Sequence, residues 1–193
     1  MVSVTETNNQ YESDFHDLVI TSSGLDSDWL GSLRGDAWSV FQSLGIPTPS
    51  RGNEQWKYTN LTPLARSKFY LRREPNGLDV LPGELNNHAP WHKSWATLVF
   101  VDGHYDENLS ALELPNGLTV GNLGTVKSLD SEVVRQNLGQ LAKPETDAFV
   151  ALNTAFLNDG AFVRVDDDAT IELPVHLLFI TTDGQRPGVT YPR

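Results

Sequence analysis

The sequence contains no cysteine among its 193 residues. The chain therefore forms no disulfide, offers no thiolate to a metal ion and has no cysteine nucleophile. A chain without cysteine fits a reducing compartment.

Basic residues are also scarce. Lysine and arginine total 14 against 25 acidic residues, which gives a formal net charge of -11. A surface of this sign repels phosphate backbones and anionic lipids, so we expect neither nucleic acid nor a membrane surface as a partner. The pair Arg72 and Arg73 is too short to change this expectation.

Long apolar runs are missing as well. No stretch approaches the roughly 20 apolar residues of a membrane span, and the first 20 residues, "MVSVTETNNQYESDFHDLVI", lack the basic start of a secretory signal. Hydrophobic residues make up 39% of the chain, as in folded globular proteins. We therefore expect a soluble cytoplasmic protein with one sizeable domain or two small ones.

Helical patterns occupy two parts of the chain. Residues 1–15 are polar and are predicted to be loose, whereas a helix is predicted to start near Asp26–Asp28 and to end at Gly45 and Pro47. Its apolar stripe consists of Trp29, Leu33, Ala37, Val40, Phe41 and Leu44. A helical insert is predicted near 128–157. Its first stripe is Leu129, Val133, Leu138 and Leu141 after a cap at Ser128, and its second is Phe149, Leu152, Ala155 and Phe156.

Short strands are predicted between and after these helices. The run "ATLVFVDGHY" closes on the turn signal Asp102–Gly103, and "LELPNGLTVGNL" contains a second turn signal at Asn116–Gly117. Three further strands are predicted at Phe162–Val165, Thr170–Leu173 and Val175–Thr181. Short strands at uneven intervals are typical of either a sandwich or a β-solenoid, and the pattern alone leaves both open.

Three sequence blocks resemble one known family. They are "LGIPTPSRGNEQWKYTNLTPL", "LVFVDGHYDENLS" and "FVALNTAFLNDGAFVRV" followed by "IELPVHLLF". In this order they resemble the N-terminal region of SufD, a component of the SufBCD iron–sulfur cluster assembly complex. The "WKYT" block favours SufD over its paralogue SufB. The matching positions are Gly45, Pro47, Thr48, Glu54, Trp56, Lys57, Tyr58, Thr59, Leu61, Leu98–Gly103, Leu109, Ser110, Ala151, Leu152, Asn153, Ala155, Phe156, Asp159, Gly160, Pro174, His176 and Leu177.

The resemblance implies a fold and a process. It implies mainly β structure with α: an N-terminal helical region over 1–77, then over 78–193 the first rungs of a right-handed parallel β-helix that breaks off at Arg193. It implies a non-catalytic scaffold that acts with SufB-like and SufC-like proteins. The family's cluster-forming histidine and cysteine lie further toward the C-terminus, so no catalytic or metal-binding residue is carried over. The open end of such a β-helix is expected to self-associate.

The block Glu54–Thr59 has two interpretations. Trp56 can pack between the helical region and the first β-helix rungs, with Lys57 in water and Thr59 or Asn60 capping the next turn. Alternatively, the block is an aromatic and cationic patch for a partner or ligand. The first interpretation is the commoner role of a large aromatic side chain at an element boundary, and the resemblance does not choose between them.

Other polar groups are weaker candidates. His88 and His92 have helical metal-ligand spacing, but Pro90 lies between them; His104 and His176 are interpreted as a solvent-facing and a satisfied strand histidine. Asp166–Asp168 with Glu172 are read first as a solvated corner, and otherwise as a cation site or the carboxylates of a solenoid enzyme that acts on polysaccharide. A plain protein-interaction module is the third functional reading.

Overall fold

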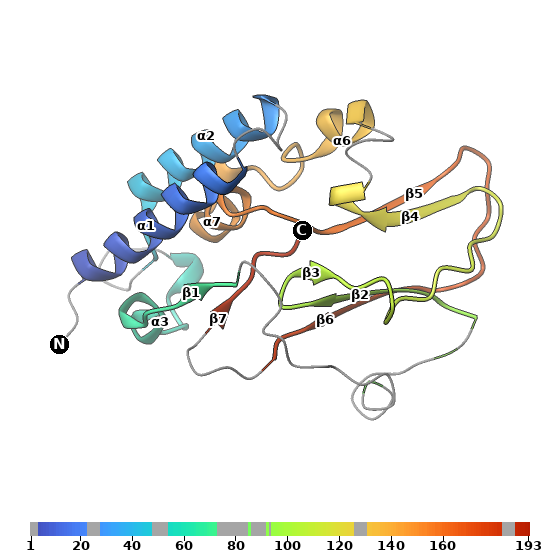
Figure 1. Cartoon of the computed structure of the whole chain (residues 1–193). Helices are drawn as coiled ribbons and strands as arrows, with labels where there is room; N and C mark the ends of the chain where they lie inside the picture. The colour runs from blue at the N-terminus through green and yellow to red at the C-terminus, as the bar shows by residue number, and fades with distance from the viewer. Residues whose placement is uncertain are drawn as a thin grey trace. The chain divides into compact units, whose positions relative to one another are not determined.

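The computed structural model in Figure 1 describes residues 4–22, 28–47, 54–72, 85, 92, 94–125, 131–182 and 188–193. The chain divides into two compact units. The helical unit comprises Met1–Leu71, Arg135–Leu157 and Arg186–Val189, and the strand unit comprises Arg72–Val134, Asn158–Gln185 and Thr190–Arg193. The segment 135–157, which the sequence analysis placed with the strands, thus groups with the N-terminal helices.

The helical unit is built from α1 (Val4–Ser22), α2 (Asp28–Leu44), the 3-10 turn η2 (Glu54–Trp56), α3 (Thr62–Arg66), η3 (Pro144–Thr146) and α7 (Ala148–Ala155). A short parallel pair joins β1 (Tyr70–Leu71) to β7 (Gly188–Val189). Helix α2 and the apolar helix α7 occur where the sequence predicted them.

Helix α1 corrects the prediction that residues 1–15 are loose. Tyr11, Phe15 and Leu18 lie four and three residues apart, which places them on one helix face. Tyr11 and Leu18 are buried, while the polar residues between them face outward. The prediction failed because most residues of this segment are polar and its apolar stripe is narrow.

Aromatic rings form the core of the helical unit. The Phe156 ring, just after α7, lies with its centroid 6.5 Å from Tyr11, 5.9 Å from Phe15 and 6.0 Å from Trp38, in edge-to-face arrangements. Phe41 of α2 completes the cluster. Helix α7 is therefore part of the core that α1 and α2 share.

The buried face of α2 overlaps only in part with the predicted stripe, of which Ala37 and Phe41 are buried as predicted. Leu30, Arg34 and Trp38 are buried, whereas Leu44 is exposed. Arg34 reaches the interior because its Nε donates a hydrogen bond of 2.7 Å to the carbonyl oxygen of Leu157. A charged side chain with such a partner can occupy a core position that pattern reasoning assigns to the surface.

The strand unit contains β2 (Ala96–Val101), β3 (His104–Tyr105), β4 (Leu118–Asn122), β5 (Ala161–Val165) and β6 (Val175–Ile180). In the order β3-β2-β6, β2 runs antiparallel to β3 and parallel to β6, from Ala96↔Val175 to Val101↔Ile180. Strands β4 and β5 form a separate antiparallel pair. Helix α6 (Ser131–Asn137) comes between β4 and β5 in the chain.

Strand β2 is buried on both faces. Leu98 and Phe100 pack against Leu118 and Val120 of β4, so the two sheets form two layers of the strand unit (Figure 1). Val99 and Val101 pack on the other side against Leu85 and Leu109, with Leu178 and Ile180 of β6 beside them. This double burial explains why β2 reads as an unbroken apolar run.

The turn predictions hold at Asp102–Gly103 and Asn116–Gly117. Asp102 and Gly103 have φ of 48° and 83°, and Gly117 has φ of 82°. The buried Asp102 carboxylate accepts hydrogen bonds from the backbone N–H of Thr182 at 3.0 Å and its hydroxyl at 2.6 Å. These bonds tie the end of β2 to the end of β6.

Two predictions fail in the strand unit and the insert. Thr170–Leu173 is not a strand but a connection between β5 and β6. A turn precedes it, in which the Ala169 N–H donates a hydrogen bond to the Asp166 carbonyl, and Pro174, which has no N–H to donate, follows it. Helix α6 ends at Asn137, so Leu138 and Leu141 lie beyond it, and Leu141 is fully exposed.

The described residues contain more helix than strand, whereas the resemblance implied mainly β structure with α. Their strands form one sheet of three and two of two, and a coil of parallel rungs is not confirmed. No described helix is both long and apolar enough to cross a membrane. Predictions for Asp26, Ser27, Thr48, Arg73, His88, Ser128 and Leu129 lie outside the described residues.

Candidate functional site

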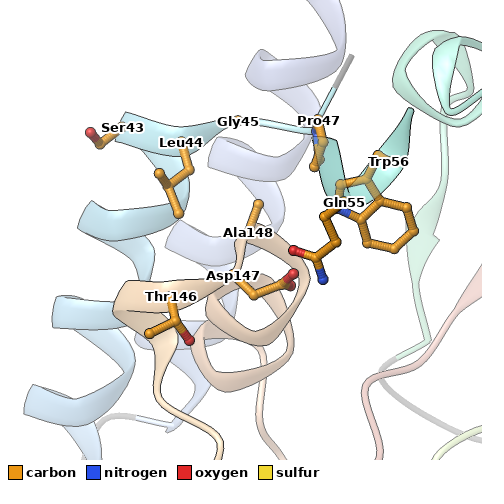
Figure 2. Close-up of a pocket in the computed structure, with 9 residues that line it drawn as sticks. All are labelled: Ser43, Leu44, Gly45, Pro47, Gln55, Trp56, Thr146, Asp147 and Ala148. Carbon is orange, nitrogen blue, oxygen red and sulfur yellow. The ribbon is translucent and has the colours of Figure 1, made fainter. Parts of the chain in front are cut away.

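A pocket of about 380 Å³ opens in the helical unit beside the Glu54–Thr59 block. It lies between the C-terminal end of α2, the turn η2 and the start of α7 (Figure 2). Its lining residues come from three chain segments: Ser43, Leu44, Gly45, Pro47, Gln55, Trp56, Thr146, Asp147 and Ala148.

The first wall is the end of α2. Gly45 has φ of 61°, and its N–H donates a 2.7 Å hydrogen bond to the Phe41 carbonyl, which is the left-handed glycine cap that ends many helices. The chain then turns through the buried Pro47. The last carbonyl groups of α2 give this wall a partial negative charge.

The second wall is η2 with Trp56. The Trp56 ring is half-buried and meets the Phe149 ring of α7 edge to face, with centroids 5.3 Å apart and planes at 73°. The sequence predicted that this ring packs between the helical region and the first β-helix rungs, and the contact with Phe149 confirms the helical side of that prediction. Its partner is a helix of the same helical unit, and packing against rungs is not confirmed.

The rest of the block faces solvent. Tyr58 is 93% exposed, and the Lys57 ammonium lies 5.6 Å from its ring centroid and 3.7 Å from the Glu54 carboxylate. Neither Thr59 nor Asn60 is the N-cap of α3, which is Leu61. The side-chain oxygen of Asn60, one residue earlier, accepts a 3.0 Å hydrogen bond from the N–H of Thr62. Trp56 thus anchors the block, and Tyr58 projects from it.

The third wall is the start of α7. The Asp147 carboxylate caps this helix, because Oδ1 accepts hydrogen bonds from the N–H groups of Phe149 at 2.8 Å and Val150 at 3.0 Å. In Figure 2 the Asp147 side chain points toward Gln55 across the pocket. Among the nine described lining residues, Asp147 is the one acid, and none is basic.

Comparison with known proteins places this chain in a family. The family model described as "SufBD protein N-terminal region" matches residues 5–177, which include every residue of the pocket. The chain belongs to the SufBD family. This confirms the resemblance to the N-terminal part of SufD and SufB proteins.

A relative of the SufBD chain is known in Synechocystis sp. It is an iron-sulfur cluster assembly SufBD family protein, 30% identical over 173 residues. The match covers 89% of this chain but 37% of the relative. This SufBD chain therefore spans well under half the length of that relative.

Three described histidines of the SufBD chain, His92, His104 and His176, lie in the strand unit, whereas His16 lies in α1 of the helical unit. Nδ1 of the exposed His92 lies 2.7 Å from the Ser94 hydroxyl, and His176 of β6 packs edge to face on Trp95 with centroids 5.6 Å apart. His104 lies in β3 and is half-buried rather than solvent-facing. Among the described residues, no three histidine, aspartate or glutamate side chains are grouped to hold a metal ion.

The carboxylates Asp166–Asp168 lie in the turn after β5, and Glu172 follows in the connection to β6. All four are exposed. Asp166 Oδ1 lies 3.6 Å from Arg164 Nε, and Asp168 has φ of 63°, which an aspartate in a tight turn tolerates. These observations support the solvated-corner interpretation.

Sequence reasoning found Gln55 and Trp56 but missed the other side of the pocket. Asp147, directly before an apolar run, carries the signal of a helix N-cap. No signal in the sequence indicated that this cap meets the end of α2, because the two segments lie about a hundred residues apart in the chain.

Proposed function

We propose that this chain is the N-terminal part of a SufD-like, non-catalytic scaffold subunit in cytoplasmic iron–sulfur cluster assembly. It would act with SufB-like and SufC-like proteins. Membership of the SufBD family, the "WKYT" block and the family of the Synechocystis relative support the proposal. The cluster is cargo here, and a chain without cysteine offers it no thiolate.

The observation that carries the scaffold proposal is the parallel pairing of β2 with β6. Similar residues stand opposite each other: Leu98 pairs with Leu177, Val99 with Leu178, Phe100 with Phe179 and Val101 with Ile180. The Phe100 and Phe179 rings stack, with centroids 4.9 Å apart and planes at 19°. In-register stacking of like residues on parallel strands is how successive rungs of a solenoid pack.

Strands β5 and β6 leave apolar side chains exposed at the edge of this layer. Leu177 and Phe179 are 41% and 44% exposed, although Leu98 and Phe100 beside them are fully buried. Val163 and Val165 of β5, paired with Val120 and Leu118, are exposed to a similar degree. Since paired residues point to one side of a sheet, all four face the same interior. We infer that, in the functional protein, a further rung of strands covers these exposed side chains of β5 and β6.

Thiol labelling tests this covering, because the 193-residue sequence has no cysteine of its own. Phe179→Cys in the intact protein, as its gene encodes it, is expected to react at least about tenfold more slowly than Leu141→Cys at the exposed site. Peptide mass spectrometry reads each position separately. Equal rates at both positions would show that β6 stays uncovered, and the β-helix proposal would fail.

A further inference from the structure

We propose that the pocket between α2, η2 and α7 is a docking site for an arginine side chain of a partner protein. The inference concerns the helical unit alone, so it does not depend on iron–sulfur cluster assembly being the process. It rests on the charge of the lining, on the aromatic wall formed by Trp56, and on the exposed Tyr58 two residues further along the chain.

Charge favours a cation in the pocket. The carboxylate of Asp147 is the single formal charge among the described lining residues, and the carbonyl end of α2 adds partial negative charge. The start of α7 contributes partial positive charge, but Asp147 already caps and neutralises it. The sum is close to one negative charge in a concave site.

The polar groups suit a guanidinium group. Asp147 Oδ1 already accepts the two capping hydrogen bonds, so Oδ2 is the carboxylate oxygen that would accept an N–H bond from arginine. The side-chain oxygen of Gln55, toward which Asp147 points in Figure 2, offers a further acceptor. Trp56 supplies a ring surface on which a flat cation can stack. The volume of about 380 Å³ is at the small end for ligand pockets, which fits one side chain.

An exposed aromatic side chain close in the sequence to the Trp56 wall favours a protein as the source of the cation. Tyr58 stands two residues after Trp56 and is 93% exposed, and such an aromatic is typical of protein interfaces. Lys57 does not line the pocket, and its charge is offset by Glu54 at 3.7 Å.

The test uses the assigned NMR spectrum of the intact protein and three probes: acetyl-Gly-Arg-Gly-amide, the same peptide with neutral citrulline, and butylguanidinium. We expect the arginine peptide to shift the Trp56 indole and Gln55 amide signals with a Kd near 1 mM, as a single anchoring side chain gives. The citrulline peptide is expected to bind at least about tenfold more weakly.

Three variants separate binding from folding. Asp147→Asn keeps a good helix cap but removes the charge, so the arginine peptide is expected to bind about tenfold more weakly. Gln55→Glu adds an acid at an exposed position and is expected to tighten binding about threefold. Glu145→Gln, which removes an exposed acid outside the lining, is the matched control and leaves the Kd unchanged.

The proposal is overturned if the citrulline peptide binds as well as the arginine peptide, or if Asp147→Asn has no effect on Kd. No shift of Trp56 up to about 20 mM arginine peptide would also overturn it. If butylguanidinium binds as tightly as the peptide, the site accepts small guanidines and the protein partner is wrong.

Discussion

Truncation of Phe156 to alanine tests whether α7 belongs to the core of α1 and α2. The Phe156 ring is 1% exposed and lies within 6.5 Å, centroid to centroid, of Tyr11, Phe15 and Trp38. Removing a buried phenylalanine costs about 3–5 kcal/mol, and the lost edge-to-face contacts place this site toward the upper end. Because the total free energy of unfolding of a small domain is about 5–15 kcal/mol, this loss is a large fraction of it.

Urea unfolding followed by amide hydrogen exchange of α1 and α2 measures the effect. We expect faster exchange in both helices and a free energy of unfolding lower by about 4 kcal/mol. Phe156→Leu, which keeps most of the volume, is expected to lose only about 1 kcal/mol and remains measurable if the alanine variant unfolds. Leu141→Ala, at a residue that is 97% exposed, is the control.

The packing argument is refuted if Phe156→Ala costs less than about 1 kcal/mol, the range of a surface substitution. It is equally refuted if only α7 loses protection while α1 and α2 exchange as before. In that case α7 would pack independently of α1 and α2.

Two further predictions concern pH and binding. Burial, together with the nearby Asp14 carboxylate, raises the pKa of Tyr11 above the usual tyrosine value of about 10. Below pH 10 the phenol is neutral in both folded and unfolded chains; above it the unfolded chain ionises first, so the stability advantage of the wild type over Tyr11→Phe should shrink as pH rises. Tyr58→Phe, at the exposed tyrosine, is the control, and a difference between wild type and Tyr11→Phe that stays constant between pH 8 and pH 11 in urea titrations would contradict the prediction. Separately, the 193-residue chain alone is expected to bind a SufC-like ATPase weakly or not at all, because the resemblance to SufD implies that the ATPase-binding part lies further toward the C-terminus. Tight 1:1 association in a pull-down would refute this.

Much of the fold was predictable where local signals agree. Gly45 and Pro47 end α2 as predicted, and the glycine turns at Gly103 and Gly117 have the positive φ that their sequences require. The strands at Ala161–Val165 and Val175–Ile180 follow from β-branched and aromatic runs between turns. These features depend on residues close together in the sequence, so local sequence patterns are enough to predict them.

Tertiary packing decided the rest. The burial of Arg34 depends on the carbonyl of Leu157, and the pocket brings Leu44 to Asp147, so neither was visible in a local pattern. The pairing of β2 with β6 is reflected in the sequence. "LVFV" and "LLFI" match residue by residue, but with 79 positions between them they do not form a repeat of recognisable period.

The most direct test of the account is cluster assembly in the cell. The gene for this protein is deleted, and the fraction of a reporter iron–sulfur protein that carries its cluster is measured by absorbance and iron content. The account predicts that this fraction falls and returns when the intact protein is expressed again. A reporter loaded to the same level with and without the gene, under conditions where the gene is normally expressed, would contradict the proposed scaffold function.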